Sequence, residues 1–294
     1  MKIAVFTKNR SNPAYEAARL GADRAAWRFG AQTLHFVPEK GDDPVEQSQL
    51  IEEALGLPPD AFAIAPVHPS LVNAALQRIN AAGIPLFAFI NPVSAARCVC
   101  YVGSDDYRLG FEIAQHLYAH MKGRGRVLLV SGPLASVTSN ARVRAFRDAA
   151  ALHPGVTIAG ACAGDYVREV ARDAVLRWIA SNGPFDGCAA ANDVMALGVA
   201  DALREAGRKA TIVGVNAIPG AIEAIKNGDM LATADFDAMR MAFLATECAI
   251  RHLRGERVPA NIELPVQIVE HNNLHVWDVP YTQRSIPTLA ETVA

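Results

Sequence analysis

The sequence lacks an excess of either charge and lacks long apolar runs. Its 28 basic and 30 acidic residues give a net charge of -2, whereas binding to a phosphate backbone needs a basic face. No apolar run approaches the ~20 residues that a membrane-spanning helix requires. The first residues, Met1–Phe6, are typical of a core strand and not of a secretory signal. With 294 residues, 51% of them hydrophobic, the chain is expected to be globular, with two cores of ordinary domain size.

Cysteine is scarce and odd in number, which does not favour a disulfide framework. The cysteines stand mostly in apolar segments and are expected to be buried thiols: Cys98, Cys100, Cys162, Cys188 and Cys248. His116 and His120 have a metal-compatible spacing, but no third ligand follows, so we expect surface histidines and no metal site. Walker A, GxGxxG, GxSxG and HExxH sequences are absent, and the sequence predicts neither a cofactor nor an enzyme.

Short apolar segments alternate with amphipathic helical patterns along the whole chain. In the first part the expected strands and helices cover residues 3–7, 13–29, 33–37, 44–55, 61–65, 71–82 and 85–89. The pattern restarts after residues 101–106, with strands expected at 126–131, 157–161, 188–191 and 211–215. Strands that alternate with helices predict βαβ units and parallel sheets. The sequence therefore predicts an α/β protein with two doubly wound lobes, whose strand-end loops line a ligand cleft.

The most informative motif, Asn192–Gly198, follows the apolar run at 188–191. Asn192 is expected at the carboxyl end of a parallel strand, where open α/β sheets place ligand-binding groups. Its amide offers a donor and an acceptor, which suits a polyhydroxylated ligand. The alternative is a residue that only occupies a turn. Asp193 is expected to cap the helix at 194–204 through its carboxylate.

Several short motifs stand in a fixed order along the chain: Asn12–Tyr15, Gly83–Pro85, Val102–Asp106, Arg142–Phe146, Asn192–Gly198, Ile212–Asn216, Arg254–Pro259 and Leu264–Val266. Through these motifs the chain resembles, over nearly its whole length, the type I periplasmic sugar-binding proteins of the ribose-binding group. The resemblance implies two lobes, joined by three crossing strands, that close on a ligand. Residues 1–104 plus 237–265 are expected to form the N-terminal lobe. Residues 105–236 plus 266–294 are expected to form the C-terminal lobe.

The resemblance also implies a set of ligand-contacting residues. Asn12, Arg142 and Asn192 match sugar-contacting positions of the family, and Tyr15 and Tyr166 match positions where aromatic rings stack on the sugar. Lys8 lies in the first strand-to-helix loop, and Asp105 lies at the first crossing. The full set that we expect to contact the ligand is Lys8, Asn12, Tyr15, Asn91, Asp105, Arg142, Tyr166, Asn192, Asn216 and Phe236.

Departures from the ribose binders change the expected ligand. Ile90-Asn91 replaces an Asp-Arg pair, Asn216 replaces an aspartate, and Phe236 replaces a glutamine. These changes disfavour ribose as the ligand. They predict a neutral sugar or polyol that is hydrogen-bonded by neutral amides. They also remove the carboxylates that would balance Arg142, while Lys8 and Arg10 add positive charge in the first strand-to-helix loop, and unpaired buried cations are costly. A sugar acid or another anion is therefore the alternative ligand, unless an aspartate such as Asp105, Asp165 or Asp235 balances the charge.

The function that follows from the resemblance is that of a receptor which delivers a solute to the membrane permease of an ABC importer. The resemblance implies a periplasmic monomer that binds no nucleic acid. The cytosolic ligand-sensing core of a regulator is an alternative, since repressors of the lac type share the fold but carry a DNA-binding domain. An enzyme on the same fold is a third possibility, because a fold does not determine function.

Overall fold

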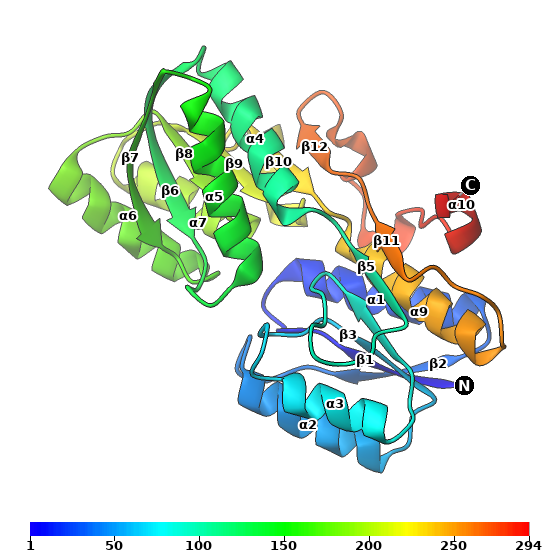
Figure 1. The fold of residues 1–294 in the computed structure, drawn as a ribbon. Helices are drawn as coiled ribbons and strands as arrows, with labels where there is room; N and C mark the ends of the chain where they lie inside the picture. Colours follow the sequence, from blue (N-terminus) through cyan, green and yellow to red (C-terminus); the bar gives the residue numbers. More distant parts are fainter. Residues whose placement is uncertain (294) are drawn as a thin grey trace. The chain divides into compact units, whose positions relative to one another are not determined.

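The computed structural model describes residues 1–293 of the chain, which form two compact units (Figure 1). Unit 1 contains Met1–Ser104, Asp237–Leu264 and the segment from Tyr281 onward, and unit 2 contains Asp105–Phe236 and Pro265–Pro280. Each unit holds one six-stranded sheet with α-helices packed against it. The predicted class, an α/β protein with two lobes built on mainly parallel sheets, is confirmed.

Unit 1 has an entirely parallel sheet with the order β11-β5-β4-β3-β1-β2. Its strands are β1 (Lys2–Phe6), β2 (Gln32–Phe36), β3 (Ala61–Ile64), β4 (Leu86–Phe89), β5 (Cys100–Gly103) and β11 (Asn261–Glu263). Its helices are α1 (Pro13–Arg28), α2 (Pro44–Gly56), α3 (Asn73–Ala81), α9 (Ala238–Leu253), the 3-10 turn η2 (Tyr281–Gln283) and α10 (Leu289–Val293). Apart from the exposed Lys2, the central strands β1, β3 and β4 are apolar and buried, because helices cover both of their faces.

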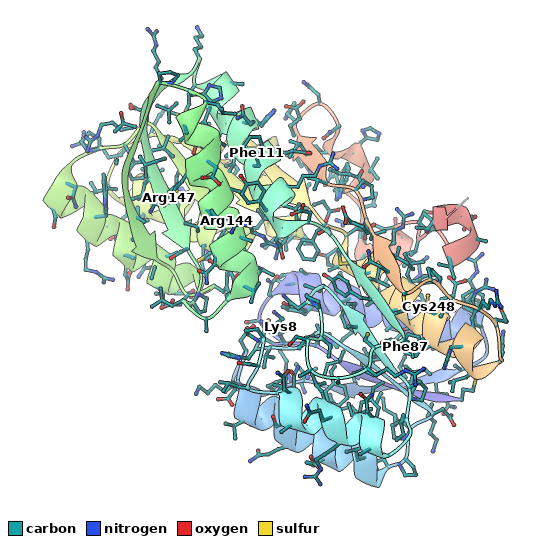
Figure 2. The ribbon with its side chains drawn as sticks, viewed as in Figure 1. Lys8, Phe87, Phe111, Arg144, Arg147 and Cys248 are labelled. Atoms are coloured by element: carbon teal, nitrogen blue, oxygen red, sulfur yellow. The ribbon has the colours of Figure 1, made fainter. Side chains whose placement is uncertain are left out.

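The core of unit 1 shows this two-sided burial. On one side of the sheet, Phe6 stacks on Phe36 and Phe62, with ring centroids 4.8 and 5.7 Å apart, and this cluster lies under α2 and α3. On the other side, α9 packs on β3, β4 and β5 and against α1. Phe87 on β4, which is labelled in Figure 2, makes an edge contact with His252 of α9. The order of the strands reverses between β1 and β3, which is the switch point of a doubly wound sheet.

Unit 2 repeats this architecture with the order β12-β10-β9-β8-β6-β7, in which only β12 is antiparallel. Its strands are β6 (Arg124–Ser131), β7 (Gly155–Ala163), β8 (Gly187–Ala190), β9 (Thr211–Val215), β10 (Ala232–Asp235) and β12 (Gln267–Glu270). Its helices are α4 (Asp106–His120), α5 (Val137–Ala151), α6 (Arg168–Asn182), α7 (Asp193–Glu205), α8 (Pro219–Lys226) and the 3-10 turn η1 (Leu274–Val276). The strand order reverses between β6 and β8, which places the switch point of this sheet there.

The C-terminal segment corrects the expected domain assignment. Residues 266–294 were all expected in the second lobe, but the chain returns to unit 1 after Pro280. The Nη1 atom of Arg24 donates to the carbonyl oxygen of Arg284 at 2.6 Å. The buried carboxylate of Glu247 accepts from the backbone N–H of Leu289 at 2.8 Å. These contacts tie the tail to α1 and α9, and they join residues too distant in sequence for a local pattern to indicate them.

Within the described residues, no helix is long and apolar enough to cross a membrane. In the same part of the chain, no group of three His, Cys, Asp or Glu side chains is arranged to hold a metal ion. All the cysteines are free thiols: Cys100, Cys188 and Cys248 are buried, and Cys98 and Cys162 are half-buried. His120 is exposed, and the half-buried His116 lies 3.3 Å from a carboxylate oxygen of Glu270.

Candidate ligand-binding site

The carboxyl ends of the parallel strands of unit 2 lie at one edge of its sheet. Tyr166 follows β7, Asn192 follows β8, Asn216 follows β9 and Phe236 follows β10. Because these neighbouring strands are parallel, their ends bring the four residues to the same edge. The fold therefore gathers on this edge residues that the sequence separates by up to 70 positions.

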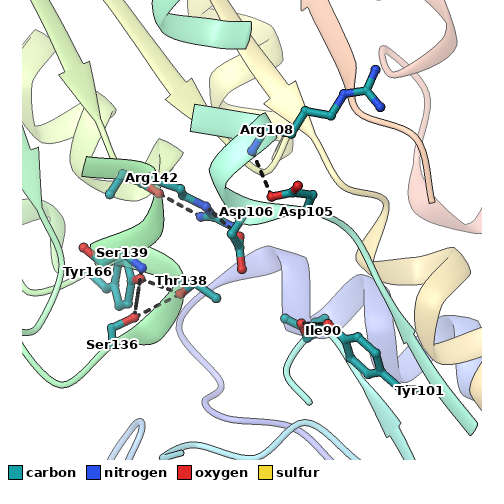
Figure 3. A network of polar contacts seen from close by, with 11 residues as sticks. Ile90, Tyr101, Asp105, Asp106, Arg108, Ser136, Thr138, Ser139, Arg142 and Tyr166 are labelled. Atoms are coloured by element: carbon teal, nitrogen blue, oxygen red, sulfur yellow. Dashed lines mark hydrogen bonds and ion pairs between the residues drawn. The ribbon is translucent and has the colours of Figure 1, made fainter. Parts of the chain in front are cut away.

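Arg142 on α5 is the buried cation of this edge, with 4% of its surface exposed. Its Nε and Nη2 atoms donate to Oδ1 of Asp106 at 2.9 and 2.6 Å, and its Nη1 atom donates to the carbonyl oxygen of Ala191 at 2.8 Å. Figure 3 shows the pairing with Asp106. The guanidinium carbon also lies 5.5 Å from the ring centroid of Phe236. Arg142 thus links the start of α4 to the chain after β8 and β10, across the switch point of the sheet.

Asp106 corrects the expected charge balance of Arg142. The sequence reasoning left this arginine without a carboxylate partner unless Asp105, Asp165 or Asp235 approached it, but the partner is Asp106. Asp105 instead caps α4, where its Oδ1 accepts from the backbone N–H of Arg108 at 3.0 Å. Both aspartates stand in the motif Val102–Asp106. Helical phase decides between them, because the residue before a helix turns back onto its backbone and the next one projects outward.

Tyr166 presents a fixed aromatic ring at the end of β7. Its hydroxyl lies between Oγ of Ser136 at 2.8 Å and Oγ1 of Thr138 at 3.0 Å (Figure 3). Gly132 makes room for the ring, because a Cβ at position 132 would overlap it. Burial raises the pKa of the Tyr166 phenol above its ordinary value, since the charged phenolate is poorly solvated there. The hydroxyl is engaged within the protein, which leaves the ring face as the surface for an apolar ligand face.

Asn192, and not Asp193, is the cap of α7. Its backbone is extended, and its Oδ1 accepts from the backbone N–H of Met195 at 2.9 Å. Only 2% of its surface is exposed. The expectation that Asp193 caps this helix was wrong, because that residue already has a helical position in the first turn. With the oxygen of Asn192 engaged in capping, its Nδ2 amide is the group that we expect to donate to a ligand.

Asn216 and Asn91 each carry a buried side-chain oxygen without a hydrogen-bond partner among the described residues. Asn216 has a left-handed backbone with φ of 124°, and Asn91 is 8% exposed at the end of β4. Buried acceptors are normally paired. A hydroxyl group that donates to either oxygen would satisfy it.

The remaining residues expected in unit 1 lie around the end of β1 and the start of α1. Lys8 follows β1 and is buried, and its position is labelled in Figure 2. Asn12 caps α1 by accepting from the backbone N–H of Ala14 at 3.0 Å. Tyr15 lies half-buried in the first turn of that helix. These placements are compatible with ligand contact, and the contacts themselves stay a prediction.

A strained connection after β4 was not expected from the sequence. Ile90, a β-branched residue, has a left-handed backbone with φ of 65°. The hydroxyl of Tyr101 donates to its carbonyl oxygen at 2.9 Å and holds this conformation. Gly103 leaves room for the Tyr101 hydroxyl, which a Cβ at that position would overlap. Strain immediately before Asn91 indicates that the direction of this amide is determined by tertiary contacts.

The two units and their strand-end polar groups define a two-lobed α/β ligand-binding protein. The chain belongs to the family described as periplasmic binding protein domain, whose model matches residues 3–257. The resemblance seen in the sequence is thereby confirmed.

The chain is similar to known receptors for sugars and polyols. It is 28% identical to a xylitol-binding protein of Mycolicibacterium smegmatis over 195 residues, 66% of this chain and 56% of that protein. It is 24% identical to the ribose import binding protein of Haemophilus influenzae over 267 residues, 91% of this chain and 90% of that protein.

Solved structures show the same architecture. An ABC transporter periplasmic solute-binding protein from Actinobacillus succinogenes, with bound D-allose, matches with a TM-score of 0.88 and 25% identity, over 92% of this chain and 98% of that one. A solute-binding protein from Bacillus halodurans, with bound myo-inositol, has a TM-score of 0.86 over 94% of this chain and 96% of that one. At 21% identity, the second match bears on the fold alone.

Proposed function

We propose that this protein is the solute-binding receptor of an ABC importer and that its ligand is a neutral, polyhydroxylated molecule, a sugar or a polyol. The family and the similarity to receptors for xylitol and ribose support the class of ligand. The observation that supports an uncharged ligand is the pairing of Arg142 with Asp106. The strand-end residues described above are proposed to contact the solute.

The charge around Arg142 argues against an anionic ligand bound at this arginine. An arginine that binds a carboxylate usually offers it two parallel N–H groups. In Arg142, Nε and Nη2 already donate to Asp106, and Nη1 donates to the carbonyl oxygen of Ala191. The buried Asp193 also acts electrostatically on this guanidinium. A carboxylate bound at Arg142 would share the guanidinium with Asp106, and because one positive charge would then face two negative charges, burying it there is costly.

The uncharged groups of the site suit a ligand with hydroxyl groups and an apolar face. Asn91 and Asn216 offer buried acceptor oxygens, and Asn192 offers an amide donor. A sugar hydroxyl can donate to the first two and accept from the third. The rings of Tyr166 and Phe236 supply apolar surfaces for the C–H face of the solute.

The proposal includes the setting in which such a receptor works. The relatives are import-binding proteins, and we infer a periplasmic location and a membrane permease as the partner that receives the solute. The protein is proposed to act as a monomer, without catalysis or a cofactor and without binding nucleic acid. Ligand binding would favour a closed state, because only a ligand with differential affinity shifts such an equilibrium.

Calorimetry against matched panels tests the proposed ligand. The neutral panel is xylitol, D-ribose, D-allose and myo-inositol, and the anionic panel is D-gluconate and D-ribonate. We expect at least one neutral compound to bind, and to bind at least about tenfold more tightly than either acid, a difference of about 1.4 kcal/mol. Tight binding of an acid with no binding of any neutral compound would reject the neutral ligand.

Two substitutions of Asn192 separate its role as a helix cap from its role in binding. Asn192→Ala removes both, so we expect weaker binding and a loss of about 1 kcal/mol in the free energy of unfolding. Asn192→Asp keeps an oxygen for the N–H of Met195 but removes the amide donor. We expect it to retain near-normal stability and to bind the solute at least about tenfold more weakly, the loss of one buried hydrogen bond. Calorimetry and urea unfolding measure the two effects, and normal binding by Asn192→Asp would mean that Asn192 is only a cap.

A further inference from the structure

Asp193 is a fully buried carboxylate at the edge of the sheet in unit 2 that the proposed ligand contacts do not use. Its side chain is 0% exposed. Its Oδ1 accepts from the hydroxyl of Thr233 on β10 at 2.7 Å, and its Oδ2 accepts from the backbone N–H of Ile218 at 3.1 Å. One carboxylate thus joins the start of α7 to the end of the β9–α8 connection and to β10. Burying a carboxylate costs free energy, so we expect the carboxylate at this junction to have a function.

The β9–α8 connection is a strained part of this edge, as is the connection after β7 at Asp165 and Tyr166. Asn216 and Ala217 are consecutive residues with positive φ, 124° and 50°, and neither is glycine. The backbone N–H of Ala217 donates to Oγ1 of Thr233 at 3.2 Å, and the same hydroxyl donates to Asp193. Such a conformation persists only where surrounding contacts over-determine it. Here Thr233 and Asp193 are those contacts, and they hold two successive N–H groups of the turn.

The sequence of β9 is adapted to this carboxylate. Gly214 lies directly against Asp193, and a Cβ at position 214 would overlap its Oδ1 atom. Asp193 also follows Asn192, whose Nδ2 group we expect to donate to the solute. Asp193 is therefore next to one amide of the candidate site in the sequence, and it is hydrogen-bonded to the turn that carries the other amide.

We propose that Asp193 is a positioning residue: together with Thr233 it holds the strained turn at Asn216 in the conformation that binds the solute. The inference rests on the proposed function, because it concerns the affinity of that same site. Asp193 does not contact the ligand. It acts by fixing the direction in which the Asn216 side-chain oxygen meets a ligand hydroxyl.

The ionisation of Asp193 gives this role a pH signature. Burial raises its pKa from the ordinary 3.8 to about 6, although hydrogen bonds from Thr233 and Ile218 and the charge of Arg142 lower it. Arg142 is the charged side chain that acts on it, and Asp106 is the partner of that arginine. Protonation of Oδ2 removes the acceptor of the Ile218 N–H, and protonation of Oδ1 reverses the hydrogen bond with the Thr233 hydroxyl, so either change alters the contacts that hold the turn. Affinity is therefore expected to fall as the pH decreases through about 6.

Asp193 affects the stability of the empty protein in the opposite direction: a decrease in pH is expected to weaken binding, but it increases the contribution of this carboxyl group to stability. Because folding raises the pKa of Asp193, its contribution to stability is greatest below the unfolded value of 3.8 and is lost as the pH rises to about 6. A merely structural effect on the folded fraction would make binding follow stability. If Asp193 instead positions the turn, binding becomes weaker at acidic pH although protonation of Asp193 favours the folded state.

Titration of the full chain with xylitol, D-ribose, D-allose and myo-inositol between about pH 5 and about pH 8 tests the inference. We expect the wild-type affinity for the bound compound to fall by about tenfold over that range, the effect of one proton on a group that titrates near 6. Asp193→Asn is expected to bind at least about tenfold more weakly at neutral pH and to show no such fall. Thr233→Val is expected to bind weakly too, whereas Thr233→Ser retains the hydroxyl and is expected to bind normally.

The outcomes separate this inference from the proposed function. If the wild type binds none of the neutral compounds, the proposed function fails. If the wild type binds one of them and Thr233→Val and Asp193→Asn bind it equally well, the positioning role of Asp193 is rejected and the proposed function stands. If Asp193→Asn does not fold, the comparison of Thr233→Val with Thr233→Ser decides, because valine keeps the size of threonine without its hydroxyl, and serine keeps the hydroxyl without the methyl group. Equal affinity of the two Thr233 variants would also overturn the inference.

Discussion

Replacing Arg142 with methionine is expected to lower the free energy of unfolding by about 3 kcal/mol and to abolish detectable binding of the solute. The substitution leaves the carboxylate of Asp106 and the carbonyl oxygen of Ala191 without their buried donor. It also removes the cation from the ring of Phe236. An uncompensated buried charge costs more than the original pair contributes, which is why removal of one partner has a large effect.

The matched control for this prediction lies two residues further along the same helix. Arg144 is exposed, and its guanidinium carbon lies 5.0 Å from the ring centroid of Tyr107 (Figure 2). Arg144→Met is expected to change stability by less than about 1 kcal/mol and to leave binding intact. Urea unfolding and calorimetry on both variants make the comparison. Similar losses in the two variants would show that Arg142 has no special part in the site.

The second large effect is expected in unit 1, from Gly21→Ala. Gly21 lies where α1 crosses α9, and a Cβ there would overlap the carbonyl oxygen of Met239. Because both partners are helix backbone, the helices must move apart, at an expected cost of about 2–3 kcal/mol. This cost exceeds the gain of about 1 kcal/mol that alanine has over glycine in a helix.

Gly56→Ala is the control for this second prediction. Gly56 is the last residue of α2, and no atom lies within 4 Å of a Cβ built there. Without a clash only helix propensity acts, so we expect this variant to be as stable as the wild type or up to about 1 kcal/mol more stable. Denaturant unfolding of both variants tests the pair. The argument from helix packing would fail if Gly21→Ala were as stable as Gly56→Ala.

Local patterns were sufficient to predict most of the fold. The helix expected at 13–29 is observed as Pro13–Arg28, and the strand expected at 157–161 is observed as Gly155–Ala163. These elements have clear apolar periodicity and clear end signals, such as the proline at the start of α1. The short strands β5 and β11 were not expected. Each has only three or four residues, and pairing in the sheet makes them strands: β5 pairs with β4 on one side and with β11 on the other.

Local patterns were not sufficient to assign the carboxylates of the site. Asp105 and Asp106 are adjacent, as are Asn192 and Asp193. Asp106 was not among the aspartates expected to balance Arg142, and Asp193, not Asn192, was expected to cap α7. The first residue of each pair caps a helix, and the second projects onto a distant element. A shift of one residue at a helix start rotates the side chain by about 100°, too fine a difference for a sequence pattern to indicate.

The sequence by itself determined the α/β class, the two parallel sheets and the strand ends at which Asn91, Asn192 and Asn216 stand. Apolar periodicity and chain order contain this information, because helices and strands depend mainly on residues that are close in the sequence. Only the tertiary structure decided that Arg142 is neutralised by Asp106, that Asp193 holds the turn at Asn216, and that the tail returns to unit 1. Each of these depends on which side chains meet after the sheet has formed, and contacts over tens to hundreds of residues leave no periodic trace in the sequence.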